Sequence, residues 1–261
     1  MYYHQYRIMK KLENKTVFIT GGLSGIGKAC AIAAAHEGAN IVIADRSRDY
    51  SIDSLNDIKV IQPNAIHIEC NVSVYSEVEE AIKSVYNTFG RLDVALNNAG
   101  IGGKPSKLAD MDIESWLHVL DVNLNGIFYC MKLELQQMIK QGGGVIVNMS
   151  SITGKVGYAK SAHYVASKHG ILGITQTAAL EYATEGIRIN AICPGFIHTP
   201  LLNKLELTKN DAVKKHLCEM HPMNRLGNSE EVAKAFIFLA CDDSAFITGT
   251  ALDVDGGYLA Q

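Results

Sequence analysis

The chain alternates short apolar runs rich in β-branched residues with longer stretches of helical spacing along most of its length. Such runs are typical of buried strands, and strands that alternate with helices form a parallel sheet covered on both faces. The sequence therefore predicts an α/β protein with one doubly wound parallel sheet of about seven strands. We expect strands at residues 16–20, 40–44, 65–69, 92–96, 144–149 and 187–192, and a final helix and strand within residues 229–253.

Composition narrows the possible functions. The 261 residues are 48% hydrophobic and carry a net charge of −3, which gives no electrostatic case for nucleic acid or an anionic membrane. No apolar run approaches the roughly 18 to 20 residues that span a membrane. The six cysteines and nine histidines lack the spacing of metal ligands, so we expect no catalytic metal. A soluble cytoplasmic protein follows, with residues 1–9 as a disordered extension and residues 10–261 as a single domain.

A glycine turn separates the first strand from an alanine-rich helix that runs to about Glu37. Strand, glycine turn and helix in this order leave backbone N–H groups and the positive helix end free to hold a pyrophosphate. The glycines could also make only a tight turn, since their spacing differs from the commonest dinucleotide fingerprint. The predicted binding residues in this turn are Gly21, Ser24, Gly25, Ile26 and Gly27.

Asp45 ends the second strand, about 20 residues beyond the glycine turn. A carboxylate there can accept hydrogen bonds from the adenosine ribose and repels a 2′-phosphate. Ser24 stands where a basic residue would help to hold such a phosphate. Both residues favour NAD over NADP, whereas the neighbouring Arg46 leaves use of NADP open. A surface carboxylate that merely ends a strand is the alternative reading of Asp45.

The segment around residues 150–170 brings together a hydroxyl, a phenol and an ammonium group. Ser151 follows the apolar strand 144–149, while Tyr164 and Lys168 are four residues apart on one helix face. A nearby ammonium favours a phenolate and lowers the phenol pKa from about 10, and a serine hydroxyl can donate to a developing alkoxide. The trio predicts proton transfer at a carbonyl or carbinol. Tyr-x-x-x-Lys also occurs on exposed helices without any function.

Several short motifs follow one another in a fixed order. They are Thr20-Gly21-x-x-x-Gly25-Ile26-Gly27, Asn97-Asn98-Ala99-Gly100, Asn123, Ser151, Tyr164-x-x-x-Lys168, Pro194-Gly195 and Asp255-Gly256-Gly257. From about Leu12 to Tyr258 the chain thereby resembles the short-chain dehydrogenase/reductase family. The resemblance implies a Rossmann-like fold and an NAD(H)-dependent oxidoreductase that interconverts a secondary alcohol and a ketone.

The resemblance also implies a role for each matching side chain. Tyr164 would be the general acid/base, and Ser151 would hydrogen-bond the substrate oxygen. Lys168 would hold the nicotinamide ribose and lower the tyrosine pKa, while Asn123 would position a water in a proton relay. Further cofactor contacts are expected from Asn98, Ala99, Gly100, Pro194, Gly195, Ile197 and Thr199.

The loop after the third strand departs from the family pattern. Relatives usually carry an aspartate before a valine near the adenine, whereas this chain has Asn71 and Val72. An amide oxygen can still accept a hydrogen bond from the adenine amino group. We therefore expect both residues to contact the cofactor.

The substrate is expected to lie between residues 102–107 and 152–159, beneath a lid at about residues 198–226. These walls offer no obvious anchor for a carboxylate, which favours a neutral secondary alcohol or ketone, with cyclic ones among the candidates. A 3-oxoacyl carrier-protein reductase that uses NADPH is the alternative, and Asp45 with Ser24 argues against it. A catalytically silent nucleotide-binding protein is disfavoured by the intact trio. The resemblance implies a homotetramer, with interfaces on the helices that contain Ile113 and Tyr164 and on residues 229–253.

Overall fold

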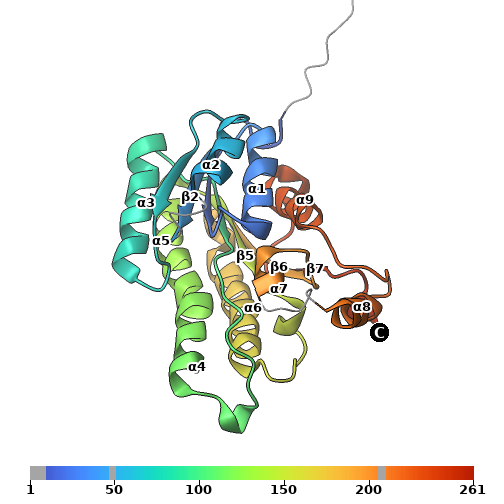
Figure 1. Ribbon diagram of the computed structural model, residues 1–261. Helices are drawn as coiled ribbons and strands as arrows, with labels where there is room; N and C mark the ends of the chain where they lie inside the picture. Colours follow the sequence, from blue (N-terminus) through green and yellow to red (C-terminus); the bar gives the residue numbers. More distant parts are fainter. Residues whose placement is uncertain (1–9, 47–50, 205–209) are drawn as a thin grey trace, which may run out of the picture.

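Seven strands pair in parallel to form one sheet with the order β3-β2-β1-β4-β5-β6-β7, which confirms the predicted doubly wound architecture (Figure 1). The computed structural model describes residues 10–46, 51–204 and 210–261, so the expected extension at residues 1–9 lies outside the described residues. The strands are β1 (Thr16–Thr20), β2 (Asn40–Asp45), β3 (Ile66–Glu69), β4 (Val94–Asn97), β5 (Gly144–Met149), β6 (Ile187–Pro194) and β7 (Ala251–Val254).

Side chains alternate along β1 between two hydrophobic cores, one on each face of the sheet. Val17 and Ile19 pack with α1 (Gly25–His36), α2 (Ser51–Lys59) and α9 (Ser229–Ala240). Phe18 packs on the other face with α3 (Tyr75–Phe89), α5 (Gly126–Gln141) and α6 (Ala162–Tyr182). The remaining helices are α4 (Ile113–Leu120), α7 (Pro200–Lys204) and α8 (Asp211–Glu219).

A π-helical turn at Asp121–Asn125 separates α4 from α5. The turn lies directly before Gly126. A Cβ atom at Gly126 would lie 2.9 Å from the Val72 side chain, so glycine lets this helix pass close to the loop after β3. Such turns are frequent at functional sites.

The helix α2 was not predicted. Of the apolar residues of this helix only Leu55 and Ile58 pack against the core, whereas Ile52 is 72% exposed. The helical spacing of apolar residues is therefore weak in this segment. The other boundaries differ from the prediction by one or two residues. None of the helices in the described part of the chain is long and apolar enough to cross a membrane.

A buried polar network joins β4, β5 and α6 to α5. The Asn97 side-chain amide donates to Glu134 and to Asn148, at 3.0 Å each, and Asn148 donates to Thr175 at 2.9 Å. Burial raises the pKa of Glu134 to about 8, although the bond from Asn97 acts in the opposite direction. The carboxyl group is therefore held protonated in the core at neutral pH.

We expect Glu134→Gln to make the protein less sensitive to alkaline pH. Because the folded-state pKa is raised from 4.5 to about 8, the folded chain keeps a proton that the unfolded chain releases between these values. This proton costs about 1.4 kcal/mol of stability for each pH unit in that window. Thermal unfolding should show that the stability of the variant relative to the wild type increases from pH 5 to pH 8. The exposed Glu181→Gln is the control, and an equal gain in both variants would contradict the assignment.

Candidate active site

Glycines shape the loop between β1 and α1. Gly21 and Gly25 have positive φ angles of 65° and 52°, which side chains rarely adopt. A Cβ atom at Gly27 would overlap the carbonyl oxygen of Gly21 and lie 2.6 Å from the Asn98 amide. The first turn of α1 can therefore lie directly against the loop, with its backbone N–H groups at the edge of the sheet.

Asn98 connects this loop to the end of β4. Its backbone N–H donates to Thr20 Oγ1 at 3.0 Å, and its side-chain amide donates to the carbonyls of Thr20 and Gly21 at 3.1 Å each. These bonds use both amide hydrogens of Asn98, so the side chain positions the loop. Ala99 also donates its N–H to Thr20 Oγ1.

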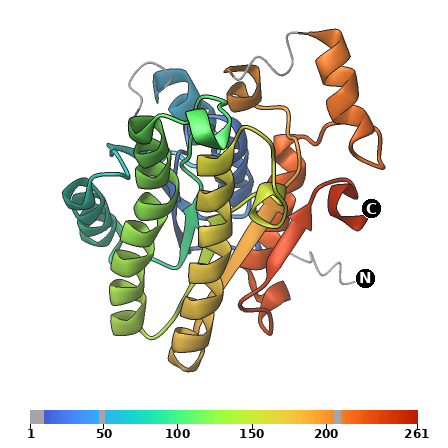
Figure 2. The ribbon, with the colours of Figure 1, turned by 90° about the horizontal axis from the view of Figure 1, so that it is seen from below.

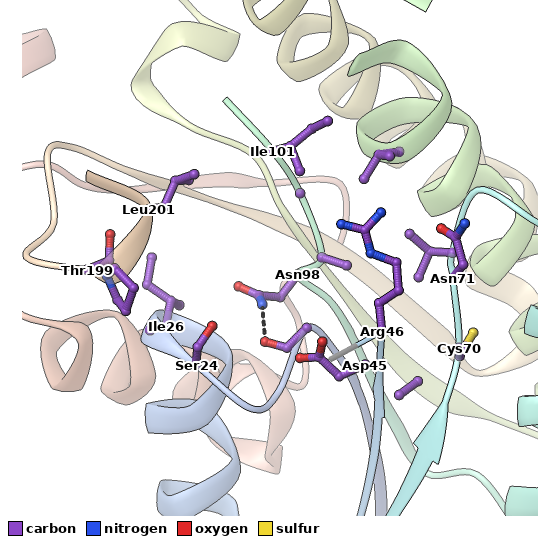
Figure 3. Close-up of a pocket in the computed structure, with 18 residues that line it drawn as sticks. Ser24, Ile26, Asp45, Arg46, Cys70, Asn71, Asn98, Ile101, Thr199 and Leu201 are labelled. Atoms are coloured by element: carbon purple, nitrogen blue, oxygen red, sulfur yellow. Dashed lines mark hydrogen bonds between the residues drawn. The ribbon is translucent and has the colours of Figure 1, made fainter. Parts of the chain in front are cut away.

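A cleft of about 230 Å³ opens above these residues (Figure 3). Thr199 and Leu201 lie on the side opposite Arg46 and Asn71, as Figure 3 shows. The predicted cofactor residues that line it are Gly21, Ser24, Gly25, Ile26, Asp45, Arg46, Asn71, Val72, Asn98, Ala99, Gly100 and Thr199. Sequence reasoning missed Ala44, Cys70, Ile101, Val122, Pro200 and Leu201, which also line the cleft.

Asp45 stands at the end of β2, beside the glycine loop. Its Oδ2 accepts a hydrogen bond of 3.1 Å from the backbone N–H of Leu23, so the carboxylate also supports the loop. Arg46 is exposed and lines the same cleft. Asp45, the expected ribose acceptor, and the cationic Arg46 therefore lie at the same end of the cleft.

The Asn71 side chain forms hydrogen bonds within its own loop. Its Oδ1 accepts from the Ser73 backbone N–H at 3.3 Å and from the Ser73 hydroxyl at 2.9 Å. The amide oxygen that was expected to face the adenine therefore closes a turn of the loop before α3. Sequence spacing does not reveal this competition.

Ser151, Tyr164 and Lys168 meet in a second cavity, of about 360 Å³. Ser151 and Tyr164 both line this cavity. Lys168 Nζ donates to the carbonyl of Met149 at 2.8 Å and lies 5.5 Å from the centre of the Tyr164 ring. The predicted trio is thus brought together at the carboxyl end of β5.

Burial dominates the electrostatics of this trio. It raises the pKa of Tyr164 to about 12, against the hydrogen bond with Ser151, which lowers it. It also lowers the pKa of Lys168 to about 8. The sequence analysis expected Lys168 to lower the tyrosine pKa; burial has the largest effect on the phenol, and its pKa is raised.

Asn123 lies in the π-helical turn and is fully buried. Its side chain accepts from the N–H of Ile101 at 2.8 Å and donates to the carbonyl of the same residue at 2.9 Å. A Cβ atom at Gly100 would lie 3.2 Å from Asn123 Oδ1 and 3.7 Å from Lys168 Nζ. Glycine at this position therefore leaves room for both side chains. The Asn123 amide therefore fixes the loop after β4 and lines neither cavity.

The expected substrate walls are found around the trio. Those that line the cavity are Gly102, Gly103 and Pro105 from one wall and Ile152, Thr153, Tyr158 and Ala159 from the other. The cavity is also lined by Pro194, Gly195, Phe196, Ile197 and Leu202. Phe196 was not predicted, whereas Leu202 belongs to the expected lid. Of the expected lid, residues 205–209 lie outside the described residues, and α8 does not line the cavity.

The cleft and the cavity adjoin each other. Both spaces are lined by Ile26, Asn98, Gly100, Thr199 and Leu201, so a ligand in the cleft lies next to the cavity of the trio. Over the ranges that the structure describes, no group of three or more His, Cys, Asp or Glu side chains could hold a metal ion.

The chain is similar to known proteins over nearly its whole length. Residues 21–259 match a family model described as enoyl-(acyl carrier protein) reductase. Cyclohexanol dehydrogenase from Acinetobacter sp. (strain SE19) is 40% identical over 251 residues, which cover 96% of this chain and 97% of that protein. A 3-oxoacyl-(acyl-carrier-protein) reductase from Staphylococcus epidermidis is 39% identical over 245 residues, 94% of this chain and 98% of that protein. The crystal structure of levodione reductase has a TM-score of 0.92 at 34% identity and covers 95% of this chain and 99% of its own.

We expect Gly27→Ala to weaken binding of NADH by about 5- to 150-fold, because overpacking by one methyl group costs about 1–3 kcal/mol. The new Cβ atom would push α1 away from Gly21 and Asn98. Gly173→Ala is the matched control, since a Cβ atom there meets nothing within 4 Å. Titration of NADH fluorescence measures both variants, and unchanged affinity in Gly27→Ala would show that close packing of the loop is not needed.

Proposed function

Because the chain belongs to the short-chain dehydrogenase/reductase family, we propose that it interconverts a neutral cyclic secondary alcohol and its ketone with NAD(H). Membership of this family makes the chain an oxidoreductase of CH–OH groups that uses a nicotinamide cofactor. The observation that carries the proposal is the convergence of Ser151, Tyr164 and Lys168 in one cavity, next to the cleft, with Lys168 Nζ 5.5 Å from the centre of the Tyr164 ring.

The glycine loop fits the pyrophosphate of a dinucleotide. Gly21 and Gly25 have backbone conformations that leave room beside the start of α1, where N–H groups and the helix dipole favour an anion. Asp45 and Ser24 support NAD, since a carboxylate at the end of β2 can accept from ribose hydroxyls and repels a 2′-phosphate. When bound, the nicotinamide supplies or accepts the hydride.

The trio supplies the proton chemistry. A pKa of about 12 keeps the Tyr164 phenol protonated at neutral pH, so it can give its proton to the oxygen of a ketone that becomes an alcohol. Ser151 donates a hydrogen bond to the same oxygen and stabilises its developing charge. Lys168, fixed by the Met149 carbonyl, is near the phenol and favours the phenolate that remains.

The lining of the cavity supports a neutral, apolar substrate. Apolar and aromatic side chains predominate, among them Ile152, Tyr158, Phe196, Leu201 and Leu202. Its charged residues are Lys168, buried within the trio, and Lys160, which is exposed. The similarity to proteins named cyclohexanol dehydrogenase and levodione reductase agrees with a cyclic substrate.

A 3-oxoacyl carrier-protein reductase that uses NADPH is the second candidate. The similarity to the staphylococcal reductase favours it, and Arg46, exposed at the cleft, could pair with a 2′-phosphate. Asp45 and Ser24 weigh against it for the reason given above. The preferred cofactor of the enzyme decides between the two.

Turnover should be seen at the nicotinamide absorbance band with NAD and cyclic secondary alcohols, and with NADH and their ketones. Tyr164→Phe should bind NADH normally and lose at least about 100-fold of the activity, since general acid catalysis contributes 10²–10⁴-fold. Activity with NADPH and a 3-oxoacyl thioester alone would instead establish the second candidate. Full activity of Tyr164→Phe would show that another group transfers the proton.

We also propose that the chain forms a homotetramer. The α4–α5 stretch and α6 lie side by side on one face of the molecule (Figure 2). Large apolar side chains are exposed there, including Ile113 at 70%, Leu117 and Phe128 at 51% each, and Leu180 at 85%. Phe246, fully exposed near β7, would belong to the second interface. Several exposed apolar residues of this size on neighbouring helices are typical of subunit contacts.

Sedimentation velocity at micromolar concentration should show a tetramer, and Leu180→Asp should reduce it to dimers, because a buried carboxylate without a partner opposes association. Val60→Asp, at a side chain that is equally exposed but lies at the end of α2, should leave the tetramer intact. A monomeric wild type would contradict the proposal.

A further inference from the structure

We propose that Phe196 sets the largest substrate that the enzyme accepts, because its ring separates the substrate cavity from a second cavity behind it. The inference rests on the proposed alcohol/ketone activity. His221 is the positioning residue that holds Phe196 in place. Phe196 lies just after the end of β6, and His221 lies just after the end of α8.

The rear cavity has a volume of about 330 Å³, close to the 360 Å³ of the substrate cavity. Only the strip Gly195, Phe196 and Ile197 lines both spaces among the described residues. Gly195 has no side chain, and Ile197 is 6% exposed and packed against Gly227. The half-buried Phe196 ring is thus the part of the partition whose removal would join the two cavities.

Aromatic rings enclose Phe196 on both sides. On the substrate side its ring centre lies 5.9 Å from that of Tyr158, in an edge-to-face arrangement. On the rear side the centres of His221 and Tyr258 lie at 5.7 and 6.2 Å, again edge to face. Such contacts fix the orientation of a ring as well as its position. The partition is therefore a rigid wall.

His221 connects this wall to the segment that carries α8. The side chain is 2% exposed, with Nε2 accepting from the Phe196 backbone N–H at 3.2 Å and Nδ1 bonded to the Leu217 carbonyl at 2.7 Å. Since a carbonyl only accepts and an N–H only donates, the imidazole is neutral, with its proton on Nδ1. A Cβ atom at Gly195 would lie 2.7 Å from Nε2, so glycine at that position permits the contact.

The rear cavity could accommodate additional substrate atoms. Its lining includes Arg225, Asp253 and Asp255. The Arg225 guanidinium is paired with Glu231 at 2.7 and 2.8 Å, Asp253 is paired with Lys155 at 2.6 Å, and Asp255 accepts from the N–H groups of Gly257 and Leu259. Because these charges already have partners, the space does not require a charged substrate. A second fused ring of a neutral substrate is the chemical group that it would hold.

The test compares cyclohexanol with a bicyclic alcohol, 2-decalol, in the full-length enzyme with NAD. In Phe196→Ala the ratio of kcat/KM for 2-decalol to that for cyclohexanol should rise by at least about tenfold, as expected when a pocket gains several methylene volumes. Leu202→Ala is the matched control, because Leu202 lines the substrate cavity and not the rear one. The control enlarges the substrate cavity without opening the rear one, so it should raise the ratio clearly less than Phe196→Ala does. Phe196→Leu, a milder change, should shift the ratio in the same direction and decides the question if Phe196→Ala does not fold.

The role of His221 is tested by separating KM from kcat. His221→Phe keeps an aromatic ring but removes the acceptor of the Phe196 N–H, so it should raise the KM of cyclohexanol while kcat and the KM of NAD stay within about twofold. His221→Gln, which offers an amide oxygen, should restore much of the affinity. An equal ratio in wild type and Phe196→Leu, with an active wild type, would overturn the inference alone. Absence of any alcohol turnover by the wild type would overturn the proposed function and this inference with it.

Discussion

The site depends on one constraint, which is that the carboxyl ends of β1, β4, β5 and β6 lie at the same edge of the sheet. Thr20 pairs with Asn97, Asn97 with Asn148, and Asn148 with Ala191, so the four strands end at one edge. The glycine loop, the Asn98 loop, Ser151 and the turn at Pro194 follow these strands directly. A register shift of one strand by a single residue would place each of its side chains in the core on the opposite face, where the packing is made for a different side chain, so packing holds the alignment in place.

Hydrogen bonds between buried polar side chains reinforce this edge. Asn97 and Asn148 would be costly to bury alone, and their bonds to each other, to Glu134 and to Thr175 compensate for lost hydration. One step further along β4, Asn98 uses its side chain to hold the glycine loop. The same strand thus stabilises the core and shapes the cofactor cleft.

Burial also determines the chemistry of the trio. Desolvation disfavours the charged forms of both Tyr164 and Lys168, so the phenol is kept as a proton donor. Phe196 and its aromatic neighbours lie at the edge of the same cavity, where Phe196 contacts both Tyr158 and His221.

The sequence by itself determined the alternation of strands and helices, the glycine turn, and the helical spacing of Tyr164 and Lys168. Each of these is a local property, set by neighbouring residues through backbone conformation and periodicity. Only the tertiary structure decided that the oxygen of Asn71 bonds to Ser73, that Asn123 holds Ile101, and that the pKa of Tyr164 rises. It also placed Phe196 between two cavities. These properties depend on packing and desolvation between segments far apart in the chain, which no local pattern encodes.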